Sequence, residues 1–258
     1  MRQHGRLLEA VGGGTELVPA GRLVERLRAV KEPGELDSIR AATALADEVL
    51  SGLRERGLAG RSEHEVALEL QAEMRRRGSE PSFPSIVAAG PNGALPHAQP
   101  RDDPIPTGTL VVVDMGAVVD GYCSDCTRTL ATGPLPDEAA GVYELVRATQ
   151  EATLELVRPG AECRSIDAFA RERIDAAGHG ERFGHGLGHG VGLEVHEQPT
   201  LSRLAEGELV AGNVVTVEPG VYLPDAFGVR VEDLVVVGED GPEVLTHFPK
   251  ELTTVGGG

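Results

Sequence analysis

Residues 108–130, GTLVVVDMGAVVDGYCSDCTRTL, predict a strand, a tight turn and a returning strand. The first strand is apolar and leads into Asp114, and the dipeptide Asp120-Gly121 is typical of a two-residue hairpin turn. In such a hairpin Thr127 faces Asp114, and Asp125 is the diagonal neighbour of Asp114 on the same face, about 7–8 Å away at Cα. The stretch therefore predicts two carboxylates held close together on one face of a hairpin.

A second stretch, residues 212–237, repeats this arrangement. Glu218 follows an apolar strand as Asp114 does, 104 positions later, and Glu232 lies on the returning strand. Repetition at this scale indicates two related structural units. Two units that face each other would bring four acids together: Asp114, Asp125, Glu218 and Glu232.

Helical spacing of apolar residues accounts for much of the remaining chain. A pair of helices is expected before each strand pair, at residues 34–56 and 62–77 and again at 137–157 and 165–177. The sequence therefore predicts an α/β (α+β) fold, built as a pseudo-twofold repeat of a helix pair plus antiparallel strands. We expect this domain to span residues 31–258, after a short lead-in at residues 1–30.

Four carboxylates in such strands need positive charge nearby. The strands are rich in valine, so burial without a counter-charge would cost many kcal/mol or force the acids to bind protons. Arg230 is the one arginine of these strands that we expect close to an acid. Two divalent cations would supply the remaining charge. Asp120, by contrast, is expected to be a solvated turn residue.

The segment 184–197, GHGLGHGVGLEVHE, carries a second group of polar residues. Each of its five glycines would cost a helix about 1 kcal/mol relative to alanine, so the segment is expected to be extended or looped. In an extended chain His185 and His189 share a face. One histidine among oxygen ligands makes a hard site, which favours Mn²⁺ or Co²⁺ over a structural zinc ion. Two such ions can activate a hydroxide and polarise a carbonyl, which predicts metal-assisted hydrolysis.

The composition narrows the function classes further. The 258 residues include 24 Lys and Arg against 41 Asp and Glu, for a formal net charge of −17, which argues against nucleic-acid or anionic-membrane partners. No apolar run is long enough for a transmembrane helix. Cys123 and Cys126 are expected to be buried small residues, and the low cysteine count is typical of a cytoplasmic protein.

These motifs resemble those of the pita-bread metallopeptidases, and within that group the branch of Xaa-Pro aminopeptidases and Xaa-Pro dipeptidases. The resemblance covers about residues 23–251 and is specific, because all five expected metal ligands occur in order. Members of this branch generally carry a large N-terminal domain, so residues 1–30 are expected to be the remnant of one. The resemblance is carried by His97, Asp114, 120–129, 184–197, 218–222 and 229–233.

The resemblance implies a site with two divalent metal ions. Asp125 and Glu232 would bridge both ions, Asp114 would complete the shell of one ion, and His189 and Glu218 would complete the other. We expect Mn²⁺ ahead of Co²⁺, Zn²⁺ or Fe²⁺ as the native ion.

The resemblance also implies the catalytic residues and the reaction. Glu218 would hold a metal-bridging hydroxide and assist proton transfer, and Arg230 would support Glu232. The substrate would be a peptide with proline at its second position, cleaved between the N-terminal residue and proline by an aminopeptidase, or an Xaa-Pro dipeptide cleaved by a dipeptidase. The resemblance leaves room for a homodimer. Three histidines would contact the substrate or stabilise the tetrahedral intermediate: His97, His185 and His196.

Methionine aminopeptidase is the main alternative, because it shares the fold and the ligands and has a similar length. Three features favour the proline-specific branch instead: the doubled Gly-His-Gly-Leu-Gly-His motif at 184–189, the Asp-x-Thr-Arg-Thr run at 125–129, and Arg230 two residues before the last acid. A metal-free binding module on this fold, or a creatinase-type amidinohydrolase, is a further alternative. Either should have lost metal ligands, and this sequence retains them.

Overall fold

The computed structural model describes residues 2–12 and 14–256. It has a helix at each of the four places where the sequence predicts a long one. The predicted helix at 34–56 is divided in two at Gly52. None of the helices in the described residues combines the length and apolar character that a membrane crossing requires. The helices are α1 (Arg2–Val11), α2 (Leu23–Ala29), α3 (Pro33–Ser51), α4 (Leu53–Arg56), α5 (Glu63–Arg76), α6 (Asp137–Leu154) and α7 (Cys163–Ala176), with the 3-10 helices η1 (Gly90–Ala94) and η2 (Gly180–Arg182).

The strands are distributed over both halves of the chain, and the pairs that the sequence analysis describes are antiparallel. The first half holds β1 (Glu80–Pro81), β2 (Ile86–Ala89), β3 (Leu110–Met115), β4 (Ala117–Val119), β5 (Tyr122–Cys123) and β6 (Cys126–Ala131). The second half holds β7 (Gly188–Gly190), β8 (Glu197–Leu201), β9 (Val214–Val217), β10 (Gly220–Leu223), β11 (Phe227–Arg230), β12 (Asp233–Val237) and β13 (Pro242–Val244).

The hairpin at Asp120-Gly121 is confirmed. Both turn residues have a positive φ, 51° and 84°, as the tight turn requires. Asp114 faces Thr127 in the β3–β6 pair, which is the predicted register. The hairpin is interrupted, however, so that its tip forms the sheet β1-β4-β5 and its base forms the sheet β2-β3-β6.

Gly116 explains this interruption. A Cβ atom at position 116 would overlap the backbone carbonyl of Ser124, so only glycine allows the two chain segments to approach so closely. The Ser124 hydroxyl accepts a hydrogen bond from the Ala117 N–H at 3.0 Å and donates one to the Ala42 carbonyl at 3.1 Å. Asp125 lies in this break, next to the start of β6.

The second half follows the same plan with more strands. β9 pairs with β12, where Val217 faces Asp233, so Glu218 and Glu232 lie just beyond the paired residues. These strands belong to a five-stranded sheet of order β13-β12-β9-β7-β8, while β10 and β11 form a separate hairpin. The segment 184–197 is extended or looped, as predicted, and contributes β7 to the large sheet.

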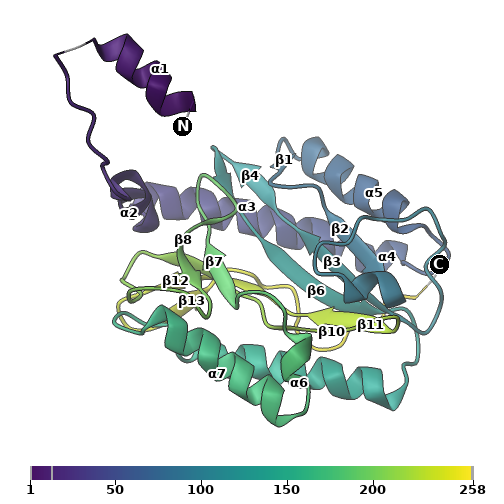
Figure 1. The fold of residues 1–258 in the computed structure, drawn as a ribbon. Helices are drawn as coiled ribbons and strands as arrows, with labels where there is room; N and C mark the ends of the chain where they lie inside the picture. The colour runs from purple at the N-terminus through teal and green to yellow at the C-terminus, as the bar shows by residue number, and fades with distance from the viewer. Residues whose placement is uncertain (1, 13, 257–258) are drawn as a thin grey trace.

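The two halves meet along β6 and the β11–β12 connection. The Glu232 N–H donates to the Thr127 carbonyl at 3.1 Å, and the Thr129 hydroxyl both donates to the Arg230 carbonyl and accepts from its N–H. Helices α3 and α5 lie on one side of the strands and α6 and α7 on the other (Figure 1). One apolar cluster joins α5 to β3 and β6, and another joins α6 and α7 to β9 and β12. The hydrogen bonds of Thr127 and Thr129 with the β11–β12 connection join the two halves, and they bring the acids of both halves to one place.

The lead-in contains α1, which the sequence did not indicate, and α2. In Figure 1, α1 stands away from the rest of the molecule. The end of the lead-in is bound to the second half, because Asn213 Nδ2 donates to the Ala29 carbonyl at 2.8 Å and the Lys31 N–H donates to the Gly212 carbonyl at 2.9 Å. Elsewhere in the chain, Cys123 and Cys126 are free and buried, which confirms the prediction.

Candidate metal centre

Asp114 enters the site from β3. One of its oxygens, Oδ2, accepts a hydrogen bond from the Arg230 guanidinium at 2.5 Å, and the other, Oδ1, is buried without a hydrogen-bond partner among the described residues. Burial raises the pKa of Asp114 although Arg230 opposes the shift. The carboxylate therefore has one oxygen free to bind a cation.

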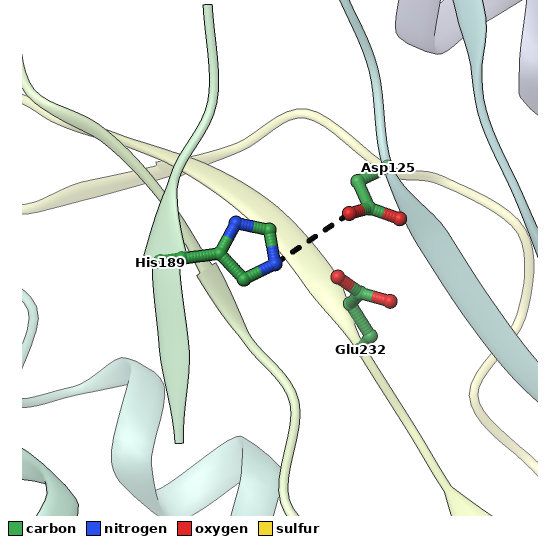
Figure 2. A group of neighbouring side chains, drawn as sticks. All are labelled: Asp125, His189 and Glu232. Atoms are coloured by element: carbon green, nitrogen blue, oxygen red, sulfur yellow. Dashed lines mark ion pairs between the residues drawn. The ribbon is translucent and has the colours of Figure 1, made fainter. Parts of the chain in front are cut away.

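Asp125 and Glu232 come from opposite halves and point toward each other (Figure 2). The Thr127 hydroxyl donates to Glu232 Oε2 at 2.6 Å, while Glu232 Oε1 is buried and has no partner in the described structure. Burial and the neighbouring carboxylates raise the pKa of Asp125 well above its usual range, and burial and Glu218 raise the pKa of Glu232 to about 8. The cluster thus carries more negative charge than the surrounding protein stabilises.

His189 projects from β7 toward the acids (Figure 2). Its Nε2 atom lies 3.2 Å from Glu218 Oε1 and 3.7 Å from Asp125 Oδ2. Burial would raise the pKa of Glu218, but the hydrogen bond and charge attraction of His189, together with Arg230, outweigh burial and lower that pKa to about 2. In the same way burial would lower the pKa of His189, and Glu218 instead raises it to about 9. The imidazolium form of His189 therefore offsets part of the negative charge.

The residues present fit a divalent metal centre. One nitrogen of His189 and one oxygen each of Asp125 and Glu232 lie within 4.8 Å of one another. Asp114 Oδ1 and Glu232 Oε1 are buried acceptors that no described protein group satisfies, and such atoms in native proteins need a partner. Carboxylate oxygens with one imidazole are ligands for hard or borderline divalent ions.

A cavity of about 480 Å³ opens onto these acids, and we call it the acidic cavity. Its apolar wall includes Phe83, Pro84 and Ile86. The structure brings all nine predicted site residues to this cavity: His97, Asp114, Asp125, His185, His189, His196, Glu218, Arg230 and Glu232.

The three remaining histidines differ in their surroundings. His185 Nε2 is 2.9 Å from the Tyr222 hydroxyl, and burial lowers the pKa of His185. The His196 ring lies against the His189 ring, with 4.1 Å between centroids, and burial lowers its pKa too. His97 follows Pro96, whose carbonyl accepts a hydrogen bond from Arg230 at 3.2 Å.

The contacts of Arg230 differ from the prediction. Its ion pair is with Asp114, and it reaches Glu232 only through Thr127, whose hydroxyl accepts from Arg230 Nε at 3.0 Å and donates to Glu232. Arg230 also donates to the Tyr222 hydroxyl at 2.9 Å. The support that we expected Arg230 to give Glu232 is therefore indirect.

Sequence reasoning missed three hydroxyl groups that orient the acids and Arg230. Thr127 contacts Glu232, and the Thr216 hydroxyl donates to Glu218 Oε1 at 3.0 Å. Tyr222 connects Arg230 with His185. Thr216 lies two residues before Glu218, a spacing that places residues on one face of a strand and could have indicated its role.

The expectation that Arg230 is the one strand arginine close to an acid is wrong. Arg128 on β6 is buried and forms an ion pair with Asp233 at 2.8 Å, and Lys250 Nζ lies 2.7 Å from the other oxygen of Asp233. Burial raises the pKa of Asp233, but Arg128 and Lys250 outweigh burial and lower it. Asp233 directly follows Glu232. Of these two neighbouring acids, Glu232 belongs to the metal centre and Asp233 to the buried ion pair with Arg128.

Comparison with known proteins agrees with this site. The sequence matches the model of metallopeptidase family M24 over residues 37–239. An uncharacterized peptidase of Bacillus subtilis is 43% identical over 244 residues, covering 94% of this chain and 69% of the relative. The Xaa-Pro dipeptidase of Pyrococcus furiosus is 40% identical over 231 residues, covering 89% of this chain and 66% of the relative. The chain thus spans about two thirds of the length of these curated relatives.

Solved structures give the same result for the fold. The X-Pro aminopeptidase of Thermotoga maritima superposes with a TM-score of 0.92 at 37% identity, covering 97% of this chain and 72% of that one. The pita-bread fold expected from the sequence is therefore confirmed. Because the family match extends over most of the chain and the acids form a centre that fits metal ions, the protein belongs to metallopeptidase family M24.

Proposed function

We propose that this protein is a metal-dependent peptidase that hydrolyses the bond between an N-terminal residue and proline. The observation that carries the proposal is the cluster of Asp114, Asp125, Glu218 and Glu232 with His189, in which two buried oxygens have no partner among the described residues. The names of the relatives, Xaa-Pro dipeptidase and X-Pro aminopeptidase, support the choice of bond.

Five residues would hold two divalent ions, for which we propose Mn²⁺ ahead of Co²⁺, Zn²⁺ or Fe²⁺. The bound ions would supply a nucleophile at neutral pH and polarise the scissile carbonyl. We propose residues 31–258 as the catalytic domain. The proposed ligands are Asp114, Asp125, His189, Glu218 and Glu232.

Glu218 is the proposed proton acceptor. Its Oε1 atom accepts a hydrogen bond from the Thr216 hydroxyl at 3.0 Å, which orients the carboxylate. The other oxygen, Oε2, has no hydrogen-bond donor in the described structure and can take up a proton from the attacking nucleophile. A positioned base of this kind contributes about 10²–10⁴-fold to a rate.

The remaining polar side chains are proposed to bind the substrate. Both ring nitrogens of His185 are already bonded, Nδ1 to the Gly186 carbonyl at 2.7 Å and Nε2 to the Tyr222 hydroxyl at 2.9 Å, so His185 would contact the substrate with the face or edge of its ring. His97 and His196 line the same cavity. The apolar wall of Phe83, Pro84 and Ile86 suits a proline ring, and the bond before proline lacks the N–H on which other peptidases depend.

A panel of peptides tests the proposal. We expect turnover of substrates with proline at the second position after Mn²⁺ or Co²⁺ is added to the purified protein, and no turnover by Asp125→Ala. Cleavage restricted to Met-Ala peptides would identify a methionine aminopeptidase instead. A protein that binds none of Mn, Co, Fe or Zn and is activated by none of them would be the metal-free binding module or creatinase-type enzyme.

A further inference from the structure

A second cavity, of about 590 Å³, adjoins the acidic cavity, and we call it the outer cavity. The two cavities share three lining residues, His185, Gly186 and Ser202. Gly186 carries no side chain, and a Cβ atom there would lie only 3.2 Å from Ser202 Cβ, so a larger residue at position 186 would narrow the space where the two cavities meet. A ligand that fills the acidic cavity and extends past His185 therefore enters the outer cavity.

Apart from the proposed metal ions, which the acids would hold, the acidic cavity has no free positive side chain in the described structure to offer a substrate. Arg230 is its only lining arginine or lysine among the described residues, and Arg230 is already bonded to Asp114, Tyr222 and the Pro96 carbonyl. A dipeptide ends in a carboxylate immediately after its proline. That carboxylate would have no free arginine or lysine of this cavity to pair with, which is unfavourable in a partly buried site.

The outer cavity contains a free arginine, which the described residues of the acidic cavity lack. Arg203 lines it and has no ion-pair partner in the part of the chain that the structure describes. The second arginine at this cavity, Arg171, is held by Asp167 and by the Phe183 carbonyl, with its guanidinium 4.3 Å from the centroid of the Phe183 ring. Arg171 thus builds the wall, and Arg203 is free to meet a negative group.

We propose that the outer cavity binds the residues that follow proline, with the terminal carboxylate near Arg203. The enzyme is then an aminopeptidase for peptides longer than a dipeptide. This inference rests on the proposed Xaa-Pro activity and adds the substrate class.

Four substrates test the inference on the Mn²⁺-loaded enzyme: Ala-Pro, Ala-Pro-Ala, Ala-Pro-Ala-Ala and the amide of Ala-Pro-Ala. We expect kcat/KM to be about tenfold or more higher for the tripeptide than for the dipeptide, because an additional residue is buried. Amidation of the tripeptide should lower kcat/KM by about twofold to fivefold, the range of an exposed ion pair.

The variant Arg203→Ala tests whether Arg203 causes the difference in kcat/KM between the acid and the amide of Ala-Pro-Ala. In this variant the acid and the amide of Ala-Pro-Ala should be cleaved equally well. The matched control is Arg54→Ala, an exposed arginine on α4, which should preserve the difference. Equal kcat/KM for Ala-Pro and Ala-Pro-Ala would overturn the inference and leave the Xaa-Pro activity standing. An enzyme that cleaves none of the four peptides would overturn both this inference and the proposed Xaa-Pro activity.

A separate observation concerns the buried ion pair of Lys31 with Glu197, the residue that follows His196. Lys31 Nζ lies 2.7 Å from Glu197 Oε1, and the two side chains are only 1% and 7% exposed. Arg28 binds the other oxygen of Glu197 at 2.5 Å. Gly192, on the same loop, lies directly against the Glu197 carboxylate, where a Cβ atom would overlap it.

We infer that Lys31 is a positioning residue for His196. Glu197 is joined to His196 by one peptide bond, so fixing the Glu197 carboxylate fixes the backbone that aims the His196 ring at His189. The inference rests on the proposed activity, in which His196 contacts the substrate.

Lys31→Met and Lys31→Arg separate positioning from stability. We expect Lys31→Met to lower kcat by about tenfold or more with unchanged metal content, since small misplacements of catalytic groups are costly. Lys31→Arg should recover most of the rate. Arg40→Met, which breaks the exposed pair of Arg40 with Glu243, is the control and should leave kcat unchanged. Folded, metal-loaded Lys31→Met with full kcat would overturn the inference, and so would an Arg variant as slow as the Met variant.

Discussion

At the scale of single residues, the Thr127 hydroxyl connects the acids of the candidate metal centre through hydrogen bonds. It donates to Glu232, a proposed metal ligand, and accepts from Arg230, which itself holds Asp114. Groups that orient metal ligands affect metal affinity nearly as strongly as the ligands do. One hydroxyl thus sets the orientation of two acids from different halves of the chain.

Replacing Thr127 by valine removes both hydrogen bonds and keeps the shape. We expect Thr127→Val to weaken metal binding by about 10–100-fold. Titration of the metal-free protein with Mn²⁺ by calorimetry measures this change. Thr127→Ser keeps the hydroxyl and should bind within a few-fold of the wild type. Equal affinity of the valine and serine variants would contradict the role of the hydroxyl.

Asp233 gives a prediction for the dependence of stability on pH. Its folded-state pKa lies below the ordinary value of 3.8, because Arg128 and Lys250 outweigh burial. Its ionised form therefore stabilises the fold fully above pH 3.8, and this contribution is lost as the pH falls through the lowered folded-state pKa. Urea unfolding at several acidic pH values should show a corresponding loss in the wild type.

The variant Asp233→Asn isolates this contribution. At neutral pH we expect its free energy of unfolding to be about 3–5 kcal/mol lower than that of the wild type, because Arg128 stays buried without its partner. The difference between variant and wild type should shrink as the pH is lowered. A constant difference across the acidic range would show that Asp233 is not the titrating group.

At the scale of elements, the strand β7 depends on glycine for its place beside β9. A Cβ atom on Gly188 would overlap the carbonyl of Thr216, whereas Gly184 has open space around it. We expect Gly188→Ala to cost about 1–3 kcal/mol of stability and to weaken metal binding, because β7 carries His189. Gly184→Ala, in the same segment, is the matched control and should do neither. Thermal unfolding and Mn²⁺ titration of both variants provide the measurement.

The same elements show what the sequence could predict. The hairpin register followed from Asp120-Gly121, because that dipeptide sets both turn type and pairing, and the repeat of Asp114 in Glu218 indicated where the acids gather. The link from Arg230 to Thr127 and the pair of Arg128 with Asp233 join residues about a hundred positions apart. Local periodicity contains no information about such contacts, which depend on how the two halves pack.

At the scale of the whole molecule, the proposed ions would join the two halves. Asp114 and Asp125 come from the first half, whereas His189, Glu218 and Glu232 come from the second. Ions bound by both sets of ligands favour the folded state over the unfolded one. At a free concentration of about 100 times Kd, one such ion adds about 2.7 kcal/mol.

Mn²⁺ should therefore raise the melting temperature by about 5–10 °C, since about 2.7 kcal/mol corresponds to that shift in a chain of this size. A chelator should reverse the increase, and differential scanning calorimetry would measure both effects. Asp125→Ala serves as the control and should show a much smaller increase. A melting temperature that Mn²⁺ leaves unchanged in the wild type would argue against ions that join the halves.

The division of the ligands between the halves has a consequence for protein engineering. The connection between β6 and α6, residues 132–136, separates the two sets of acids along the chain. A chain cut in this connection would yield two fragments, neither of which holds the full ligand set. Peptidase activity would then report fragment complementation, and the metal concentration would tune how tightly the fragments reassemble.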